Sequence, residues 1–194
     1  MIPFRGNYFR DNHLAKESQM SATIEQVPAG NYTLDPVHST FGFAVTHNGV
    51  SKFRGQFERV DAALTDGVLT GRAHVESVKT PLPALKEHLL GPEFFDAANT
   101  PTIDFRSTDI RVAGDGTVEV PGELTIRGVT QSVTATGTIA TGQGLQGDEV
   151  VGFDLQTTVD RRDFGIGWQA PLPRGGNAVA WEVTIEAHLE LAEA

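Results

Sequence analysis

Cysteine is absent from this 194-residue chain. Without thiols the protein has no disulfide, no thiolate nucleophile and no cysteine-ligated metal site. The chain is still long enough to form one domain with a substantial core. Packing and hydrogen bonding must therefore hold that domain together without covalent staples.

Positive charge is also scarce. The chain has 15 Lys and Arg against 25 Asp and Glu, a formal net charge of −10. Nucleic acids and anionic membranes are met by basic surfaces, so this balance argues against both as partners. No apolar run reaches the length of about 18 residues that would predict stable membrane insertion. A small apolar ligand or another protein suits the charge better.

Residues 1–19 differ in composition from the rest of the chain. They contain neither the apolar core nor the small-residue cleavage site of a secretory signal peptide. We expect a disordered extension or tag over 1–19 and a single domain over 20–194. A cytoplasmic location is expected in preference to a periplasmic or secreted one.

From Tyr32 onward the dominant hydrophobic period is two, the period of a half-buried antiparallel strand. Short polar turns such as Asp66-Gly67 and Arg127-Gly128 separate the runs. Even spacing of this kind indicates an all-β sandwich or up-and-down barrel. The predicted strands cover 31–35, 39–47, 56–65, 69–78, 102–112, 117–126, 131–140, 151–160 and 180–191.

One segment departs from this period. In PLPALKEHLL, over 81–90, leucines recur at helical spacing and the prolines fall in the first turn, where a helix tolerates them. Gly91-Pro92 ends the predicted helix. An aromatic loop, EFFDAANTP, follows it. We expect a short helix and this loop at one end of the sheet, about where a lid would lie.

Strand alternation places several aromatic side chains on one face. If that face points inward, the wall carries Phe41, Phe43, Phe57, Phe105, Phe153 and Trp181. The faces that would oppose it are smaller and include Gly71, Ala73, Ala135 and Gly137. Large residues facing small ones are typical of tapered solid packing. The same pattern would leave an elongated apolar slot, where each buried methylene of a lipid chain contributes about 0.8 kcal/mol.

Asp35, His38 and Ser39 have the composition of a hydrolytic triad but not its arrangement. Neighbouring side chains on an extended strand point to opposite faces, so His38 and Ser39 diverge. None of the six histidines lies at metal-ligand spacing, and the Gly-rich run at 142–147 opens no helix. The sequence therefore predicts no catalytic residue, no metal site and no cofactor.

Two histidines and an arginine pair remain as polar candidates. His38 and His47 either hold their strand by hydrogen bonds to backbone or orient the polar head of a ligand. Arg161-Arg162-Asp163 is either a surface charge cluster or an anion site. The sequence leaves both alternatives open.

Four ordered blocks resemble the YceI-like, polyisoprenoid-binding family. The first is YTLDPVHSTFGFAVTHNGVSKFRGQF, followed by LLGPEFFDAANTPTIDFRST, GELTIRGVTQSV and DRRDFGI. Together they span nearly all of the chain from Gly30 to Leu191. The segment 168–180 differs from the family pattern. Its prolines and glycines predict a mobile loop over the internal channel that the resemblance implies.

The resemblance implies an extended, lipocalin-like antiparallel β-barrel of about eight strands with one short helix near its end. It also implies a long isoprenoid, quinone-type or fatty-chain ligand in an elongated internal channel, and a homodimer. The candidate ligand-binding residues are His38, Phe41, Phe43, Val45, His47, Phe57, Leu85, Leu89, Phe94, Phe95, Phe105, Phe153, Arg162, Phe164 and Trp168.

Two other functions stay open. The first is an enzyme that acts on an isoprenoid or quinone with His38 or His47 as the acid or base. The second is an interaction module with a solid core, which would pair through the outer face of the 181–191 strand. A void inside the barrel would discriminate between this module and a lipid carrier.

Overall fold

A computed structural model describes residues 26–194 of the chain. The predicted N-terminal extension over 1–19 lies outside the described residues. Antiparallel strands dominate, with one α-helix and two short 3₁₀ turns. The strands are β1 (Asn31–Leu34), β2 (Thr40–His47), β3 (Ser51–Phe57), β4 (Val60–Thr65), β5 (Val68–His74), β6 (Val78–Lys79), β7 (Thr102–Ser107), β8 (Arg111–Val112), β9 (Thr117–Ile126), β10 (Val129–Gln143), β11 (Glu149–Asp160) and β12 (Val179–Glu193).

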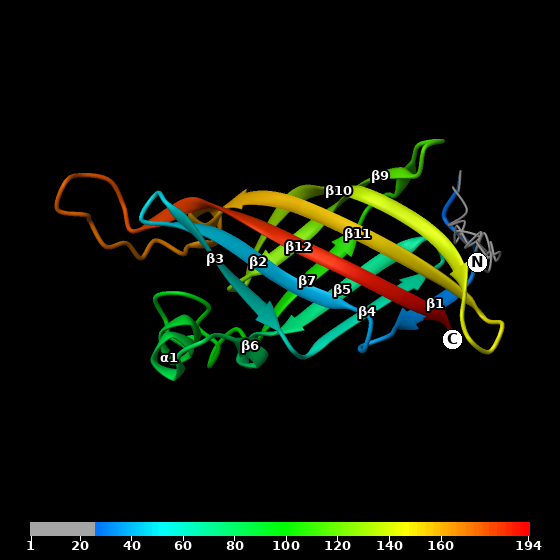
Figure 1. The fold of residues 1–194 in the computed structure, drawn as a ribbon, viewed down its shortest axis with the longest axis horizontal. Helices are drawn as coiled ribbons and strands as arrows, with labels where there is room; N and C mark the ends of the chain where they lie inside the picture. The colour runs from blue at the N-terminus through cyan, green and yellow to red at the C-terminus, as the bar shows by residue number, and fades with distance from the viewer. Residues whose placement is uncertain (1–25) are drawn as a thin grey trace, which may run out of the picture.

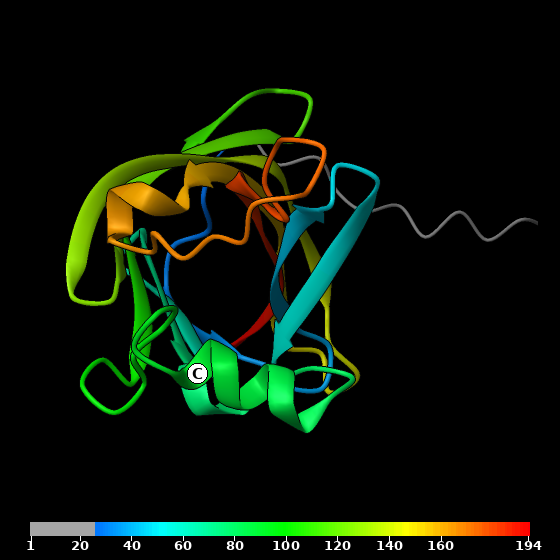
Figure 2. The same cartoon turned by 90° about the vertical axis from the view of Figure 1, so that its left-hand side faces the viewer.

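The sheet closes on itself as a barrel. Its ring runs β1-β4-β5-β7-β9-β10-β11-β12, and pairing of β1 with β12 completes it. This confirms the predicted all-β barrel of about eight strands with one short helix. β2 pairs with the remainder of β12 on the same edge that β1 uses, and β3 and β6 follow. Figures 1 and 2 show β2 and β3 extending the wall at the end opposite the chain termini.

Tight turns set the register of the hairpins. At Asp66-Gly67 and Arg127-Gly128 both residues have positive φ, the geometry of the two-residue turns whose twist matches that of the flanking strands. Asn48 and Gly49 also have positive φ, and they begin the turn between β2 and β3. The sequence prediction missed this hairpin and began the strand after 39–47 at Gln56, although Asn-Gly is a strong hairpin signal.

Three predicted strands are interrupted. The run over 56–65 breaks between β3 and β4, and that over 102–112 breaks between β7 and β8. The run over 69–78 leaves the sheet after His74, because Val75–Ser77 form a 3₁₀ turn (η1). Alternation continues through these breaks in the sequence, so the period alone could not locate them.

The single α-helix, α1 (Pro83–Leu90), starts two residues later than predicted and has Pro83 in its first turn. Leu89 on its inner side is buried. Leu82, expected on the apolar face, is 61% exposed because it precedes the helix as its N-cap. Among the described residues, no helix has the length and apolarity that a membrane crossing requires.

Buried side chains form two clusters. One fills the end of the barrel that β1 closes, and it includes Tyr32, Leu64, Val118, Val151 and Leu191. Burial and a hydrogen bond to Glu149 both raise the pKa of Tyr32 above its usual value. The second cluster lies toward α1 and includes Phe57, Val78, Leu89, Ile103 and Phe164.

Gly55 tests how tightly the aromatic wall is packed. A Cβ at this position would lie 2.5 Å from two ring atoms of Phe43, its cross-strand partner. We expect Gly55→Ala to lower the free energy of unfolding by about 1–3 kcal/mol through overpacking. Gly114→Ala is the matched control, because its Cβ would meet no atom within 4 Å. Urea unfolding measures both, and equal midpoints would contradict the packing described here.

Candidate functional site

A cavity of about 540 Å³ opens at the end of the barrel near α1. Its volume lies within the range of about 300–1,000 Å³ found for small-molecule sites. β2, β3 and β12 supply one side of its wall, and α1 with the turn after it supplies another. The short 3₁₀ turn η2 (Arg161–Phe164) and the residues after it complete the wall.

Aromatic rings make up much of this wall. Phe43 lies at centroid distances of 5.9–6.0 Å from Phe53, Phe57 and Phe95, and Phe41 lies 5.9 Å from Phe57. Such tilted and edge-to-face pairs are favourable geometries for aromatic side chains. Rings that hold one another in this way form a wall that does not collapse into the cavity.

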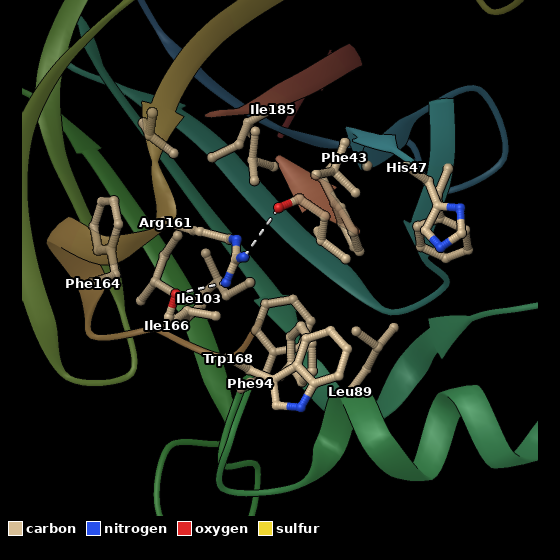
Figure 3. A pocket seen from close by; sticks show the side chains of 18 of the residues that line it. Phe43, His47, Leu89, Phe94, Ile103, Arg161, Phe164, Ile166, Trp168 and Ile185 are labelled. Atoms are coloured by element: carbon tan, nitrogen blue, oxygen red, sulfur yellow. Dashed lines mark hydrogen bonds between the residues drawn. The ribbon is translucent and has the colours of Figure 1, made fainter. Parts of the chain in front are cut away.

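A second aromatic group joins α1 to the segment after η2. The His88 ring lies edge-on to Phe94 and Trp168, at centroid distances of 4.8 and 5.0 Å. Its Nε2 also hydrogen-bonds Glu93 at 3.2 Å. Figure 3 shows Leu89, Phe94 and Trp168 side by side at this part of the cavity. These side chains bring together elements that are about 80 residues apart in the sequence, as the numbers of His88 and Trp168 show.

A narrower cavity of about 70 Å³ continues the space toward the closed end. Phe41, Ile103 and Ile185 line both cavities. The small residues expected to leave an elongated slot, Gly71 and Ala135 among them, lie on this narrow part. Most of the volume is instead at the aromatic end, because core side chains from the facing strands fill the barrel beside the small residues.

Most of the candidate ligand-binding residues come together at this site. The main cavity is lined by Phe41, Phe43, Val45, His47, Phe57, Leu85, Leu89, Phe94, Phe95, Phe164 and Trp168, and the narrow cavity by Phe105. Whether these side chains contact a ligand stays a prediction. Three candidates, His38, Phe153 and Arg162, line neither cavity.

Phe153 and His38 lie elsewhere for different reasons. Phe153 is 2% exposed in the solid cluster at the closed end of the barrel. His38 precedes β2 and His47 ends it, and the seven steps of about 3.3 Å from Thr40 to His47 alone span about 23 Å. The two histidines therefore cannot orient one ligand head.

The arginine that reaches the cavity is Arg161, whereas Arg162, the residue predicted from the sequence, lines neither cavity. Inward residues of β11 are odd-numbered, and Arg161 continues that series as the strand ends. Asp160 accepts hydrogen bonds from the Arg162 backbone N–H and guanidinium, which hold Arg162 outside the barrel. These bonds lower the pKa of Asp160 to about 2.

Arg161 is 5% exposed and bonds only to backbone carbonyls. Its Nε donates to Ala180 at 3.0 Å, Nη1 to Ile166 at 2.8 Å and Nη2 to Val179 at 3.4 Å. Burial lowers its pKa. Trp181, expected on the inner wall, stacks on Arg161 with the guanidinium carbon 4.3 Å from the ring centroid. A bulge between Val179 and Val183 interrupts the regular register of β12 at this residue.

His38 belongs to a polar cluster at the other end of β2. Its Nδ1 lies 2.9 Å from Asp35 and 3.8 Å from Glu190. The three side chains offer ligand atoms within 4.8 Å of one another, a grouping that could hold a metal ion and that the sequence did not reveal. The Asp35–His38 hydrogen bond accounts for it without a metal. Ser39 is not part of a triad, because its hydroxyl bonds the backbone of Glu190.

Sequence reasoning missed several lining residues. Phe53, Ser51 and Lys52 lie on β3, which the Asn48-Gly49 turn signal could have revealed. The loop predicted over 168–180 is folded back on itself, with hydrogen bonds from Ala178 to Ala170 and from Leu172 to Gly176. Only its first residue, Trp168, and Val179 near its end line the cavity.

The fold and the cavity define a class of protein: an eight-stranded antiparallel barrel that encloses an apolar ligand-sized space. Within that class, the chain belongs to the YceI-like family, whose domain model matches residues 32–191. This confirms the resemblance found in the four sequence blocks.

Curated relatives of the chain include several UPF0312 proteins. One from Shewanella denitrificans is 31% identical over 150 residues, which cover 72% of this chain and 78% of that protein. Another from Staphylococcus aureus is 27% identical and covers 84% of this chain and 97% of that protein.

Solved structures share the fold. BcnA of Burkholderia cenocepacia superposes with a TM-score of 0.65 at 23% identity, over 81% of this chain and 98% of that one. A polyisoprenoid binding domain from Saccharophagus degradans gives a TM-score of 0.66 at 14% identity, over 84% of this chain and 98% of that one.

The His38 cluster predicts a pH-dependent contribution to stability. The hydrogen bond to Asp35 and the nearby carboxylates raise the pKa of His38, and the same bond lowers that of Asp35. Stabilisation from His38 is present below its unfolded value of 6.5 and is lost as pH rises through its folded pKa. Stabilisation from Asp35 is present above 3.8 and is lost as pH falls through its folded pKa.

We therefore expect His38→Gln to lower the melting temperature more at about pH 5.5 than at about pH 8.5. Thermal unfolding of both proteins at the two pH values measures the difference. His188→Gln, which removes an exposed histidine whose Nδ1 lies 3.1 Å from Asp154, is the control for loss of a surface histidine. An equal loss at both pH values for His38→Gln would contradict the coupling.

Proposed function

We propose that the protein binds a long-chain isoprenoid, quinone-type or other amphiphilic lipid, and that it sequesters or carries this ligand. The observation that carries the proposal is the cavity of about 540 Å³, lined almost throughout by apolar and aromatic side chains. The narrow extension past Phe41, Ile103 and Ile185 gives a chain room to continue inward. Burial of each methylene there contributes about 0.8 kcal/mol.

The comparisons support this proposal. The chain is a member of the YceI-like family, and a structure with the same fold is described as a polyisoprenoid binding domain. Polar lining residues gather where the cavity opens: His47, Ser51 and Lys52 are all exposed, at the end of β2 and the start of β3. An amphiphile would place its chain among the aromatic rings and its head at one of the polar groups of the lining.

The other functions are less well supported. For the enzyme with His38 or His47 as its acid or base, His38 lines neither cavity, and His47 lies exposed at the rim of the main one. A solid-core interaction module does not fit a barrel with a cavity of this size. The homodimer and the cytoplasmic location stay predictions from the sequence.

Tryptophan fluorescence provides a direct binding assay. The chain has two tryptophans; Trp168 lines the cavity and Trp181 stacks on Arg161. We expect delipidated protein to change its emission on titration with polyprenols, long-chain quinones or fatty acids. Trp168→Phe should reduce the signal while competition with an environment-sensitive apolar dye still reports binding. Failure of every amphiphile to bind, in both assays, would refute the proposal.

Chain-length dependence tests whether the tail enters the narrow cavity. Gly71 lines it, and a Cβ there would meet no atom within 4 Å. We expect Gly71→Leu to fill this space and lower affinity for a long-chain ligand about tenfold, the effect of excluding roughly two methylenes. A homologue several carbons shorter should bind unchanged. Thr136→Leu, on the exposed face of β10, is the control. If Gly71→Leu and Thr136→Leu bind the long-chain ligand with equal affinity, the tail lies elsewhere.

A further inference from the structure

Arg161 is the one charged side chain that is buried among the residues that the structure describes. It lines the main cavity, in a wall made mostly of apolar groups. Figure 3 shows its guanidinium reaching inward from the end of β11, with Phe43 to one side and Trp168 below it. Burying an ion raises the free energy of the folded protein unless the ion is paired, so a buried arginine is expected to have an anionic partner.

The hydrogen bonds of Arg161 leave part of its guanidinium free. A guanidinium has five N–H groups. Three of them are directed to the carbonyls of Ala180, Ile166 and Val179. One N–H group remains on each of the two terminal nitrogens. A carboxylate can accept hydrogen bonds from two guanidinium N–H groups, one at each of its oxygens.

Arg161 forms no ion pair with any of the described residues, although the nearby charge of Asp160 partly offsets the effect of burial on its pKa. All three bonded carbonyls are neutral, and the neighbouring carboxylate of Asp160 is held by Arg162. None of the described residues that line the cavity is acidic, and its charged members are Arg161 and Lys52. This is notable in a chain whose net charge is −10. The cavity is a local positive site in an acidic protein.

We propose that Arg161 binds the carboxylate head of a long-chain acid whose tail occupies the cavity. This inference rests on the proposed function, because it requires an amphiphile in that space. The singly charged carboxylate neutralises the one buried guanidinium and accepts its two remaining N–H groups. The lowered pKa that burial gives Arg161 agrees with a site that gains from an anion.

Other head groups fit the site less well. A neutral alcohol leaves the guanidinium charge unpaired in an apolar wall. A diphosphate carries more negative charge than one buried arginine can neutralise, and the exposed Lys52 and His47 lie at the rim, on the strands beside the β2–β3 turn. The charge of the head group is therefore the property that Arg161 selects.

Palmitic acid, cetyl alcohol and cetyl phosphate, which share one tail length, test the proposal on the delipidated full chain. We expect the acid to bind about tenfold or more tightly than the alcohol, the effect of one charge-assisted interaction. Arg161→Gln should reduce this preference to near unity while affinity for the alcohol is kept. Arg161→Lys, which keeps the charge, should retain part of the preference.

Arg111→Gln is the matched control, since it removes the same charge from an exposed arginine that lines neither cavity. It should leave the preference for the acid unchanged. Loss of the preference in Arg111→Gln but not in Arg161→Gln would overturn the assignment, as would tighter binding of cetyl phosphate than of palmitic acid. If the acid and the alcohol bind equally to the wild type, the carboxylate site is refuted while the lipid-binding function stands. If no ligand of the three binds, the carboxylate site is refuted, and the titrations with polyprenols and quinones decide the lipid-binding function.

Arg161 also connects η2 to β12 through its hydrogen bonds to backbone carbonyls. If Arg161→Gln fails to fold for this reason, a measurement on the wild-type protein tests the carboxylate site instead. Palmitic acid labelled with ¹³C at its carboxyl carbon should show an ionised carboxylate in the bound state at about pH 7, where a head in an apolar site without a cation would be protonated. A protonated carboxyl group in the complex would overturn the proposal.

Discussion

The structure depends on the way β12 satisfies its backbone hydrogen bonds along one edge. Near its C-terminal end this strand pairs with β1, and along the rest of the same edge it pairs with β2. The first pairing closes the ring tightly, so that the side chains around Tyr32 and Leu191 fill that end. The second brings in the β2–β3 hairpin as an additional wall. A barrel that is solid at one end and hollow at the other follows from this division.

The hollow end stays open because its lining cannot fill it. Phe43, Phe53, Phe57 and Phe95 contact one another at ring distances near 6 Å, and each is anchored on a strand or on the turn after α1. Close packing of Phe43 over Gly55 fixes the ring further. Rigid rings on a hydrogen-bonded frame hold an apolar space that flexible side chains would enter, which is the preorganisation that ligand sites use.

Electrostatics give the two ends of β2 different chemistry. At one end His38 is bound among carboxylates and remains exposed, and at the other the cavity contains a buried arginine without a carboxylate partner. Arg161 and Arg162 show how local this control is. A single 3₁₀ turn capped by Asp160 sends one guanidinium inward and the other outward, and Trp181 lies against both.

The sequence by itself determined the strand periodicity, the tight turns, the helix after residue 81 and most of the aromatic lining, because alternation depends only on neighbouring residues. It could not locate the breaks after Phe57 and His74, where alternation continues but sheet pairing stops. Only the tertiary structure decided which strands share an edge of β12. That pairing concentrated the cavity at the aromatic end, and the carbonyls of Val179 and Ala180 on β12 hold Arg161 in its wall, since both outcomes depend on contacts between distant segments.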